Sequence, residues 1–190
     1  QLDHSNQYVI YNDSKMSVTQ DFKCQVDEIE QEAEVLPQNQ VLNRAPSSVN
    51  CIRVFYEITN DIYVANSESV NDTLNWLTSV HNIVATLYSD ASIPTTLSDV
   101  LIWQEEDPYT GDNLDKLEFF RANRLAFDGD IGHLLDLPVT GGVAYLNSLC
   151  QNFRQAFSGV SISFQQLPTY SWTVNVIAHE MGHSLGSPHT

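Results

Sequence analysis

From residue 51 onward, segments with the hydrophobic pattern of a strand alternate with segments that have the pattern of a helix. Residues 52–58 and 97–103 are short runs rich in β-branched and aromatic side chains, as buried strands are. Residues 69–87 instead place apolar side chains at helical spacing. The alternation continues with further expected elements: a helix over 114–125 and strands over 131–137, 141–146 and 160–164. Strands that alternate with helices predict an α/β fold with a largely parallel sheet.

The first fifty residues lack this alternation. Residues 8–11 are predicted to form a short strand, and residues 25–36 an acidic amphipathic helix. Asn, Gln and Ser then dominate up to residue 50, with Pro37 and Pro46 among them, which is typical of a linker. Residues 1–50 are therefore interpreted as an N-terminal extension or the remnant of a propeptide, and the sequence leaves both open.

Composition narrows the class of protein. A chain of 190 residues with 42% hydrophobic residues is sufficient for one folded domain with a full core. Eight Lys and Arg against 24 Asp and Glu give a formal net charge of −16, which argues against nucleic acid or an anionic membrane surface as partner. No run approaches the roughly 20 apolar residues that a membrane span requires.

The last twelve residues hold the most informative pattern of the chain. His179 and His183 are four positions apart, so on a helix they project from one face. Two imidazoles so placed can bind one zinc ion, and Glu180 beside them can act on a metal-bound water. Gly186 can take positive φ to end the helix, after which His189 follows as a third nitrogen ligand. Three protein ligands leave a fourth position open, which is typical of catalytic zinc.

This signal is specific because several positions are fixed together. The spacing H-E-x-x-H-x-x-G-x-x-H includes the glycine that the geometry requires, so a surface helix with two solvated histidines is the weaker interpretation. The helix is predicted to start after Ser171, a suitable N-cap. Ser184 and Ser187 lie near histidines, but those histidines are used as metal ligands, so no serine triad is expected.

Residues 179–189 resemble the metzincin zinc peptidases, and residues 176–178 are similar to their adamalysin/reprolysin branch. A second stretch agrees, since residues 141–150 resemble the edge strand of that branch, which ends in a cysteine. Between the two, residues 168–173 are similar to secreted bacterial reprolysin-like enzymes. The chain departs from the branch at Thr190, where adamalysins usually have an aspartate of the substrate-pocket wall.

The resemblance implies a zincin-like catalytic domain over residues 51–190, with a twisted, mostly parallel sheet and an antiparallel edge strand at the cleft. It implies a secreted zinc-dependent endopeptidase in which Glu180 is the general base. The resemblance assigns three residues to Zn²⁺: His179, His183 and His189. It assigns five residues to an extended protein or peptide substrate: Gly141, Gly142, Val143, Ala144 and Tyr145.

The resemblance also bears on completeness. Metzincins continue past the third histidine to a methionine-containing turn beneath the zinc, and Met16 and Met181 both precede His189. Residues 51–190 are therefore expected to be the upper part of the catalytic domain, with its C-terminal part supplied by further chain or by a companion fragment.

Two alternatives are weighed against the endopeptidase. One is another zincin whose third ligand is a glutamate from a later helix, against which the position of His189 argues. The other is a catalytically silent adhesion or binding module with a metzincin-like fold. The intact set of Glu180 and three histidines favours an active enzyme over that module.

The three cysteines allow different interpretations. A disulfide between Cys24 and Cys51 would hold the N-terminal segment to the domain and stabilise it by about 3 kcal/mol. The resemblance suggests that Cys150 pairs beyond Thr190. It also offers Cys24 as a propeptide thiolate that caps the zinc, as in some metzincin zymogens, but residues 22–27 do not match the motifs of those zymogens.

The remaining histidines and acidic residues are assigned no metal role. His4, His81 and His133 lack metal-ligand spacing, so solvated or structural side chains are expected there. Ca²⁺ is a weaker possibility, for which the candidate loop carboxylates are Asp112, Asp128 and Asp130. Their spacing is not that of an EF-hand, and turn residues in water are the preferred interpretation.

Overall fold

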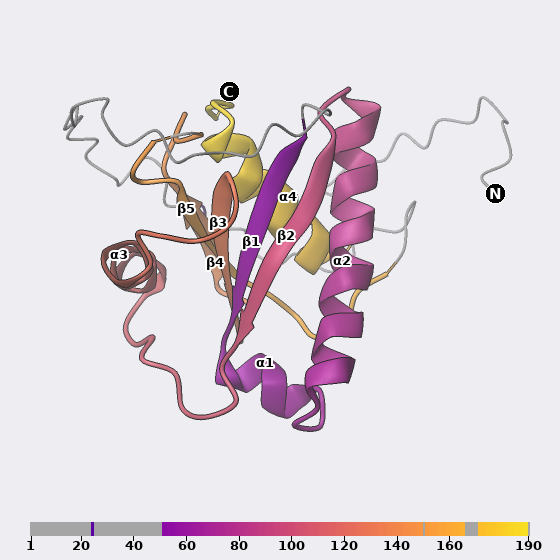
Figure 1. The fold of residues 1–190 in the computed structure, drawn as a ribbon, viewed down its shortest axis with the longest axis vertical. Coiled ribbons are helices and arrows are strands. Elements are labelled where there is room, and N and C mark those ends of the chain that lie inside the picture. Colours follow the sequence, from indigo (N-terminus) through magenta and orange to yellow (C-terminus); the bar gives the residue numbers. More distant parts are fainter. Residues whose placement is uncertain (1–23, 25–50, 150, 166–170, 190) are drawn as a thin grey trace, which may run out of the picture.

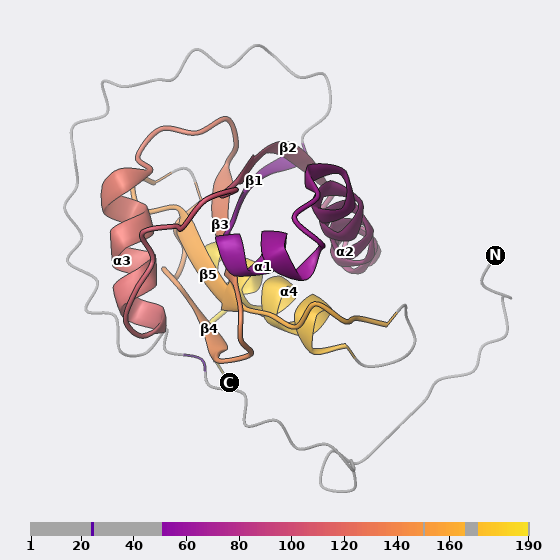
Figure 2. The ribbon, with the colours of Figure 1, turned by 90° about the horizontal axis from the view of Figure 1, so that it is seen from below.

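A computed structural model describes residue 24 and residues 51–149, 151–165 and 171–189, which form a five-stranded sheet between two layers of helices (Figures 1 and 2). Two helices, α2 and α4, cover one face, and α3 covers the other. The predicted strand over 8–11 and the predicted helix over 25–36 lie outside the described residues. No helix in the described part of the chain is long and apolar enough to cross a membrane.

The sheet has the strand order β2-β1-β3-β5-β4. Four strands are parallel: β1 (Ile52–Ile58), β2 (Thr95–Ile102), β3 (Ile131–Asp136) and β5 (Gln155–Gly159). The fifth, β4 (Gly141–Ala144), lies at one edge and runs antiparallel to β5. The expected α/β fold with an antiparallel edge strand is confirmed.

The alternation of side chains along β1 explains why helices cover both faces. Val54, Tyr56 and Ile58 are fully buried against α2 and α4, whereas Phe55 points to the opposite core beneath α3. A strand with apolar residues on both sides must be covered on both sides. That burial places β1 in the interior of the sheet, next to β3.

The predicted helices are present with small shifts in their ends. The helix expected over 69–87 is α2 (Val70–Asp90), which starts where the Ser69 hydroxyl accepts a hydrogen bond from the backbone N–H of Asp72. The helix expected over 114–125 is α3 (Asn113–Asn123), whose start is fixed by a capping box between Asp112 and Asp115. A short helix, α1 (Asn60–Ala65), follows β1 and was not anticipated.

The strand predicted over 160–164 is wrong. The strand that pairs with β3 and β4 is β5, which starts five residues before the predicted strand. The chain leaves the sheet at Val160. Val160 and Ile162 still pack on the core, but from a loop, and the Ile162 carbonyl accepts a hydrogen bond from the indole of Trp76. The apolar alternation of this segment therefore reflects its packing against α2, whereas β5 itself contains buried polar residues such as Ser158.

Candidate metal centre

The helix α4 (Trp172–Ser184) carries the histidine motif across one face of the sheet. Its apolar side chains Val176, Ile177 and Met181 are fully buried in the core shared with α2, so the helix is fixed by packing. Ser171 is the N-cap residue, as predicted, but its hydroxyl has no hydrogen-bond partner among the described residues. Instead, the indole of Trp172 donates to the Gly159 carbonyl at 2.9 Å and ties the start of α4 to the end of β5.

The helix ends at the predicted glycine. Gly186 has φ +96°, its N–H donates to the His183 carbonyl, and the Ser187 N–H donates to the Gly182 carbonyl. These two bonds form the Schellman motif, which requires a left-handed residue after the helix. The turn sends the chain back toward α4 and brings His189 beside the two helical histidines.

The three predicted ligands meet at one point. Nε2 of His179 lies 2.9 Å from Nε2 of His183 and 3.2 Å from Nε2 of His189. Nitrogen ligands at the usual zinc distance of about 2.0–2.1 Å form a tetrahedron with edges of about 3.3 Å, so the spacing is close to that of a zinc site. The three imidazoles are thus arranged around a common centre.

Hydrogen bonding and burial leave the ring nitrogens ready to bind a cation. Nδ1 of His183 lies 2.6 Å from the Ser187 carbonyl, which can only accept, so Nδ1 carries the proton and Nε2 a lone pair. Burial, together with the neighbouring His183 and His189, lowers the pKa of His179 to about 4. Neutral rings whose lone pairs face one another repel, and a shared metal ion removes that repulsion.

Cys24 completes the cluster. Its Sγ lies 3.2 Å from Nε2 of His183, and the ligand atoms of Cys24 and the three histidines all lie within 4.8 Å of one another. One thiol and three imidazoles are donors that zinc accepts in tetrahedral sites. The donor set therefore fits zinc, with Cys24 at the position that three histidines leave open.

The position of Cys24 corrects the preferred sequence interpretation. No disulfide joins Cys24 and Cys51, so the one considered between them is not formed. The interpretation judged weaker, Cys24 as a cap on the metal site, agrees with the geometry. No local pattern around Cys24 indicated this, because the contact joins residues 159 positions apart.

Glu180 lies beside the metal ligands under the edge strand. Its side chain is fully buried, with one carboxyl oxygen 3.9 Å from the Cys24 sulfur and the other without a hydrogen-bond partner among the described residues. This burial raises the pKa of Glu180 to about 8, an effect that the Cys24 thiol partly opposes. A carboxyl group so placed is suited to exchange protons with a ligand at the centre.

The strand β4 lies directly against Glu180. A Cβ added to Gly142 would lie 2.4 Å from Oε1 of Glu180, so the carboxylate occupies the space that a side chain at Gly142 would need. The backbone of Cys24 forms a parallel bridge with Gly142, so Cys24 lies along β4 at the sheet edge. The five residues predicted to bind substrate, Gly141 to Tyr145, are all buried, and Val143 and Tyr145 belong to the core under α3.

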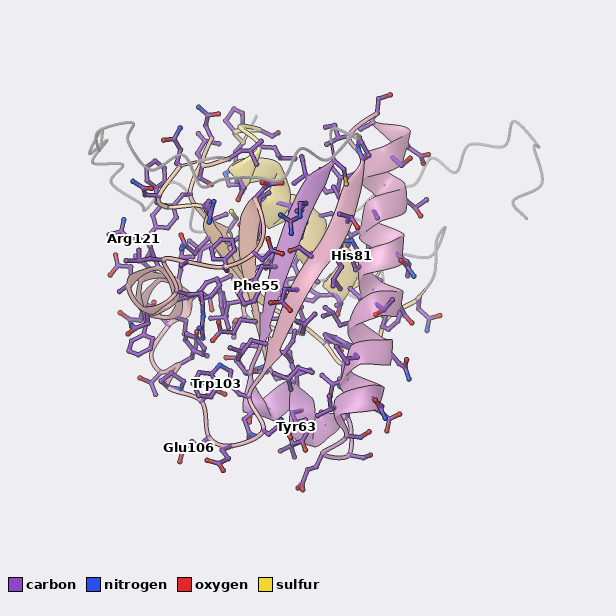
Figure 3. All side chains as sticks on the ribbon, in the orientation of Figure 1. Phe55, Tyr63, His81, Trp103, Glu106 and Arg121 are labelled. Atoms are coloured by element: carbon purple, nitrogen blue, oxygen red, sulfur yellow. The ribbon has the colours of Figure 1, made fainter. Side chains whose placement is uncertain are left out.

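His81 and His133 lie apart from this cluster. His81 faces the sheet from α2 (Figure 3), and its Nδ1 is 3.1 Å from the Tyr56 hydroxyl. His133 is fully buried on β3, where Nε2 is 2.8 Å from the Ser158 hydroxyl. Burial lowers the pKa of His81 to about 4 and that of His133 to about 3. Both are neutral core residues.

The candidate calcium ligands have other partners. Asp112 caps α3, Asp128 pairs with the guanidinium of Arg53, and Asp130 accepts a hydrogen bond from the Arg53 backbone N–H at 2.8 Å. Within the described residues, the cluster of Cys24 and three histidines is the one group arranged for a metal. Each of the three carboxylates thus has a structural role in a turn or cap.

Two solved structures are similar to part of this chain. The structure described as "Structure of a chaperone-substrate complex" is 14% identical, with a TM-score of 0.51, over 72% of this chain and 23% of that chain. A crystal structure of metalloproteinase-II from Bacteroides fragilis is 20% identical, with a TM-score of 0.49, over 74% of this chain and 43% of that chain. This chain therefore spans less than half the length of either structure.

A family model gives the more specific result. The reprolysin model of Metallo-peptidase family M12 matches residues 50–190, which include the whole sheet and all three histidines. The resemblance to metzincin-type zinc peptidases is confirmed by that match. The chain belongs to Metallo-peptidase family M12.

Proposed function

We propose that residues 51–190 are the upper part of the catalytic domain of a zinc-dependent endopeptidase, held inactive by Cys24 of an N-terminal propeptide segment. The observation that carries the proposal is the convergence of His179, His183, His189 and Cys24 beside the buried Glu180. The family match supports the peptidase activity in general terms. Secretion of the protein stays a prediction.

The three histidines would hold the zinc, and Glu180 would move the proton. A bound zinc ion supplies Lewis acidity, which polarises a peptide carbonyl and lowers the pKa of water toward about 7. Glu180 lies 3.9 Å from the Cys24 sulfur in the ligand cluster, so it would take a proton from the attacking water and return it to the leaving amine. Tyr88 donates to the Ala178 carbonyl at 2.6 Å and holds α4, with these side chains, against α2.

The peptide substrate is proposed to lie along β4. This strand is the edge of the described sheet, so its outer backbone groups can pair with an extended peptide. Gly142 has no side chain, which lets the backbone of β4 approach Glu180 closely. Cys24 lies on this same edge, because its backbone forms a parallel bridge with Gly142.

Inhibition follows from these two contacts. A thiolate at the fourth ligand position excludes the water that hydrolysis requires, and a chain paired at Gly142 excludes the substrate backbone. Both contacts must be lost before a peptide can enter. Removing Cys24 should therefore activate the enzyme without changing its fold.

The test compares two cysteine variants of the protein. Cys24→Ala should hydrolyse an unstructured protein at least tenfold faster than wild type, and a zinc chelator should abolish the activity. Cys51→Ala, which removes the other described cysteine, should behave as wild type. Equal activity of wild type and Cys24→Ala would contradict inhibition by Cys24. A zinc-loaded Cys24→Ala protein that hydrolyses nothing, even when the C-terminal part of the domain is present, would contradict the endopeptidase.

A further inference from the structure

The C-terminal end of α4 is bound by the loop that follows β4. The last carbonyls of a helix have no partner within the helix and must be satisfied from outside. Three consecutive backbone N–H groups do so here: Asn147 donates to the His183 carbonyl at 2.8 Å, and Ser148 and Leu149 donate to the Ser184 carbonyl at 3.0 and 3.1 Å. The loop thus holds the final turn of the zinc-site helix.

The backbone of Asn147 makes this convergence possible. Asn147 has φ +54°, the left-handed conformation that asparagine tolerates and β-branched residues do not. A left-handed residue within a turn directs successive N–H groups into one concave nest, which attracts negative charge. The end of a helix carries partial negative charge, so the nest and the end of α4 are complementary.

The same residue contacts the turn that leads to the third histidine. Gly186, whose positive φ reverses the chain before His189, has no side chain on the side that faces Asn147. A Cβ placed on Gly186 would be 3.2 Å from Oδ1 of Asn147. Asn147 therefore lies against the Schellman turn while its N–H holds the carbonyl of His183, which is itself in the metal cluster.

We propose that Asn147 is a positioning residue for the metal centre. Its left-handed backbone brings the loop after β4 onto the end of α4 and fixes the turn from which His189 emerges. Together with the contact between Gly142 and Glu180, this gives β4 two attachments to α4, one beside the base and one beside the ligands. The inference rests on the proposed function, because it assigns a role toward the zinc site.

The experiment measures zinc affinity by competition with a chromophoric chelator. Asn147→Val makes the left-handed backbone unfavourable, and we expect its zinc dissociation constant to rise about tenfold or more, the range for residues that support ligands. Asn147→Gly keeps access to positive φ and should stay within threefold of wild type. The visible spectrum of the cobalt-substituted protein should show distorted coordination in Asn147→Val and normal coordination in Asn147→Gly.

Ser92 provides the matched control. It is also exposed and left-handed, with φ +63°, but it follows α2, away from the metal cluster. Ser92→Val should lower the melting temperature of the metal-free protein about as much as Asn147→Val does, yet leave zinc affinity unchanged. If Asn147→Val fails to fold, Asn147→Ala gives a milder form of the same strain.

The outcomes separate the two proposals. Normal zinc affinity in folded Asn147→Val or Asn147→Ala would overturn the role of Asn147. The role would also be overturned if Asn147→Gly weakened zinc binding as much as Asn147→Val does. If Ser92→Val weakened zinc binding as much as Asn147→Val does, a general loss of stability would explain the lower affinity, and the role of Asn147 would again be overturned. Failure of the wild-type protein to bind zinc would instead overturn the proposed function.

Discussion

The sulfur of Cys24 lies 3.2 Å from Nε2 of His183, although 159 positions separate the two residues. The contact closes a ligand set of one thiol and three imidazoles. The backbone of Cys24 is held at the same time by a bridge to Gly142. Because one segment touches both the ligands and the substrate edge, metal binding and substrate access are predicted to be coupled.

Zinc should protect Cys24 from alkylation. A thiolate bound to a metal is a poor nucleophile, so iodoacetamide should modify Cys24 slowly in the zinc-loaded protein and at least tenfold faster after chelation. Cys51, the other described cysteine, should react at the same rate in both states. Peptide mapping by mass spectrometry measures both rates, and a Cys24 rate independent of zinc would contradict the thiol–metal contact.

Glu180→Gln should separate metal binding from catalysis. The variant keeps all three histidines but cannot accept a proton, so we expect zinc content near one per chain and hydrolysis reduced by about 10²–10⁴-fold. The measurement is best made with Cys24→Ala also present, so that inhibition does not mask the loss. Turnover within tenfold of Cys24→Ala alone would show that Glu180 is not the base.

Gly142→Ala should displace Glu180 without removing a ligand. The added Cβ would lie 2.4, 2.5 and 2.6 Å from three atoms of the Glu180 side chain, which are distances that no real contact has. We expect loss of hydrolysis in the Cys24→Ala background with zinc retained.

Gly182→Ala is the control for that variant, because it lies on the same helix as Glu180. Its Cβ would meet nothing closer than the Tyr88 hydroxyl at 3.7 Å. Alanine also favours a helix over glycine by about 0.5–1 kcal/mol, so unfolding in denaturant should show unchanged or higher stability. Normal activity of Gly142→Ala would contradict the tight contact between β4 and Glu180.

His189→Ala should weaken zinc binding sharply, since it removes one of three imidazole ligands and opens the site to water. Isothermal titration should show a dissociation constant raised by at least 100-fold. His133→Ala also removes a histidine but should leave zinc stoichiometry unchanged, although the cavity in the core lowers stability. Unchanged zinc affinity in His189→Ala would point to a different third ligand.

The contribution of His81 and His133 to the stability of the metal-free protein should fall in mild acid. His81 and His133 have pKa values of about 4 and 3 when folded, below the ordinary value of 6.5, because burial disfavours the charged ring. The unfolded chain therefore binds more protons than the folded one below pH 6.5. The contribution of both neutral rings to the free energy of unfolding is complete above pH 6.5 and declines as the pH falls toward 4 and then 3.

Thermal unfolding in the presence of a chelator between pH 7.5 and 4.5 tests this, because it excludes the effect of zinc release. Tyr56 lies between the two rings, which it contacts at centroid distances of 5.6 and 5.9 Å, and it stays uncharged over this range. His133→Gln should show a smaller decrease than wild type between pH 6.5 and 4.5. An identical decrease in the variant would contradict the role of His133.

Local sequence determined the parts of the protein that depend on spacing alone. The three histidines, the helix that carries two of them and the turn at Gly186 follow from a helical period of 3.6 residues and from the conformational freedom of glycine. The interior strand β1 followed from its β-branched and aromatic residues, which are apolar on both faces of the strand, as in a strand buried on both sides.

Tertiary structure decided what depends on neighbours distant in sequence. Cys24 is a lone cysteine by sequence, and only the folded domain places it against His183 and Gly142. The strand β5 has small and polar residues that suit its neighbours, such as Ser158 beside His133, so its own pattern did not reveal it. These contacts form between surfaces that meet only after folding. The hydrophobic periodicity within one segment therefore does not predict them.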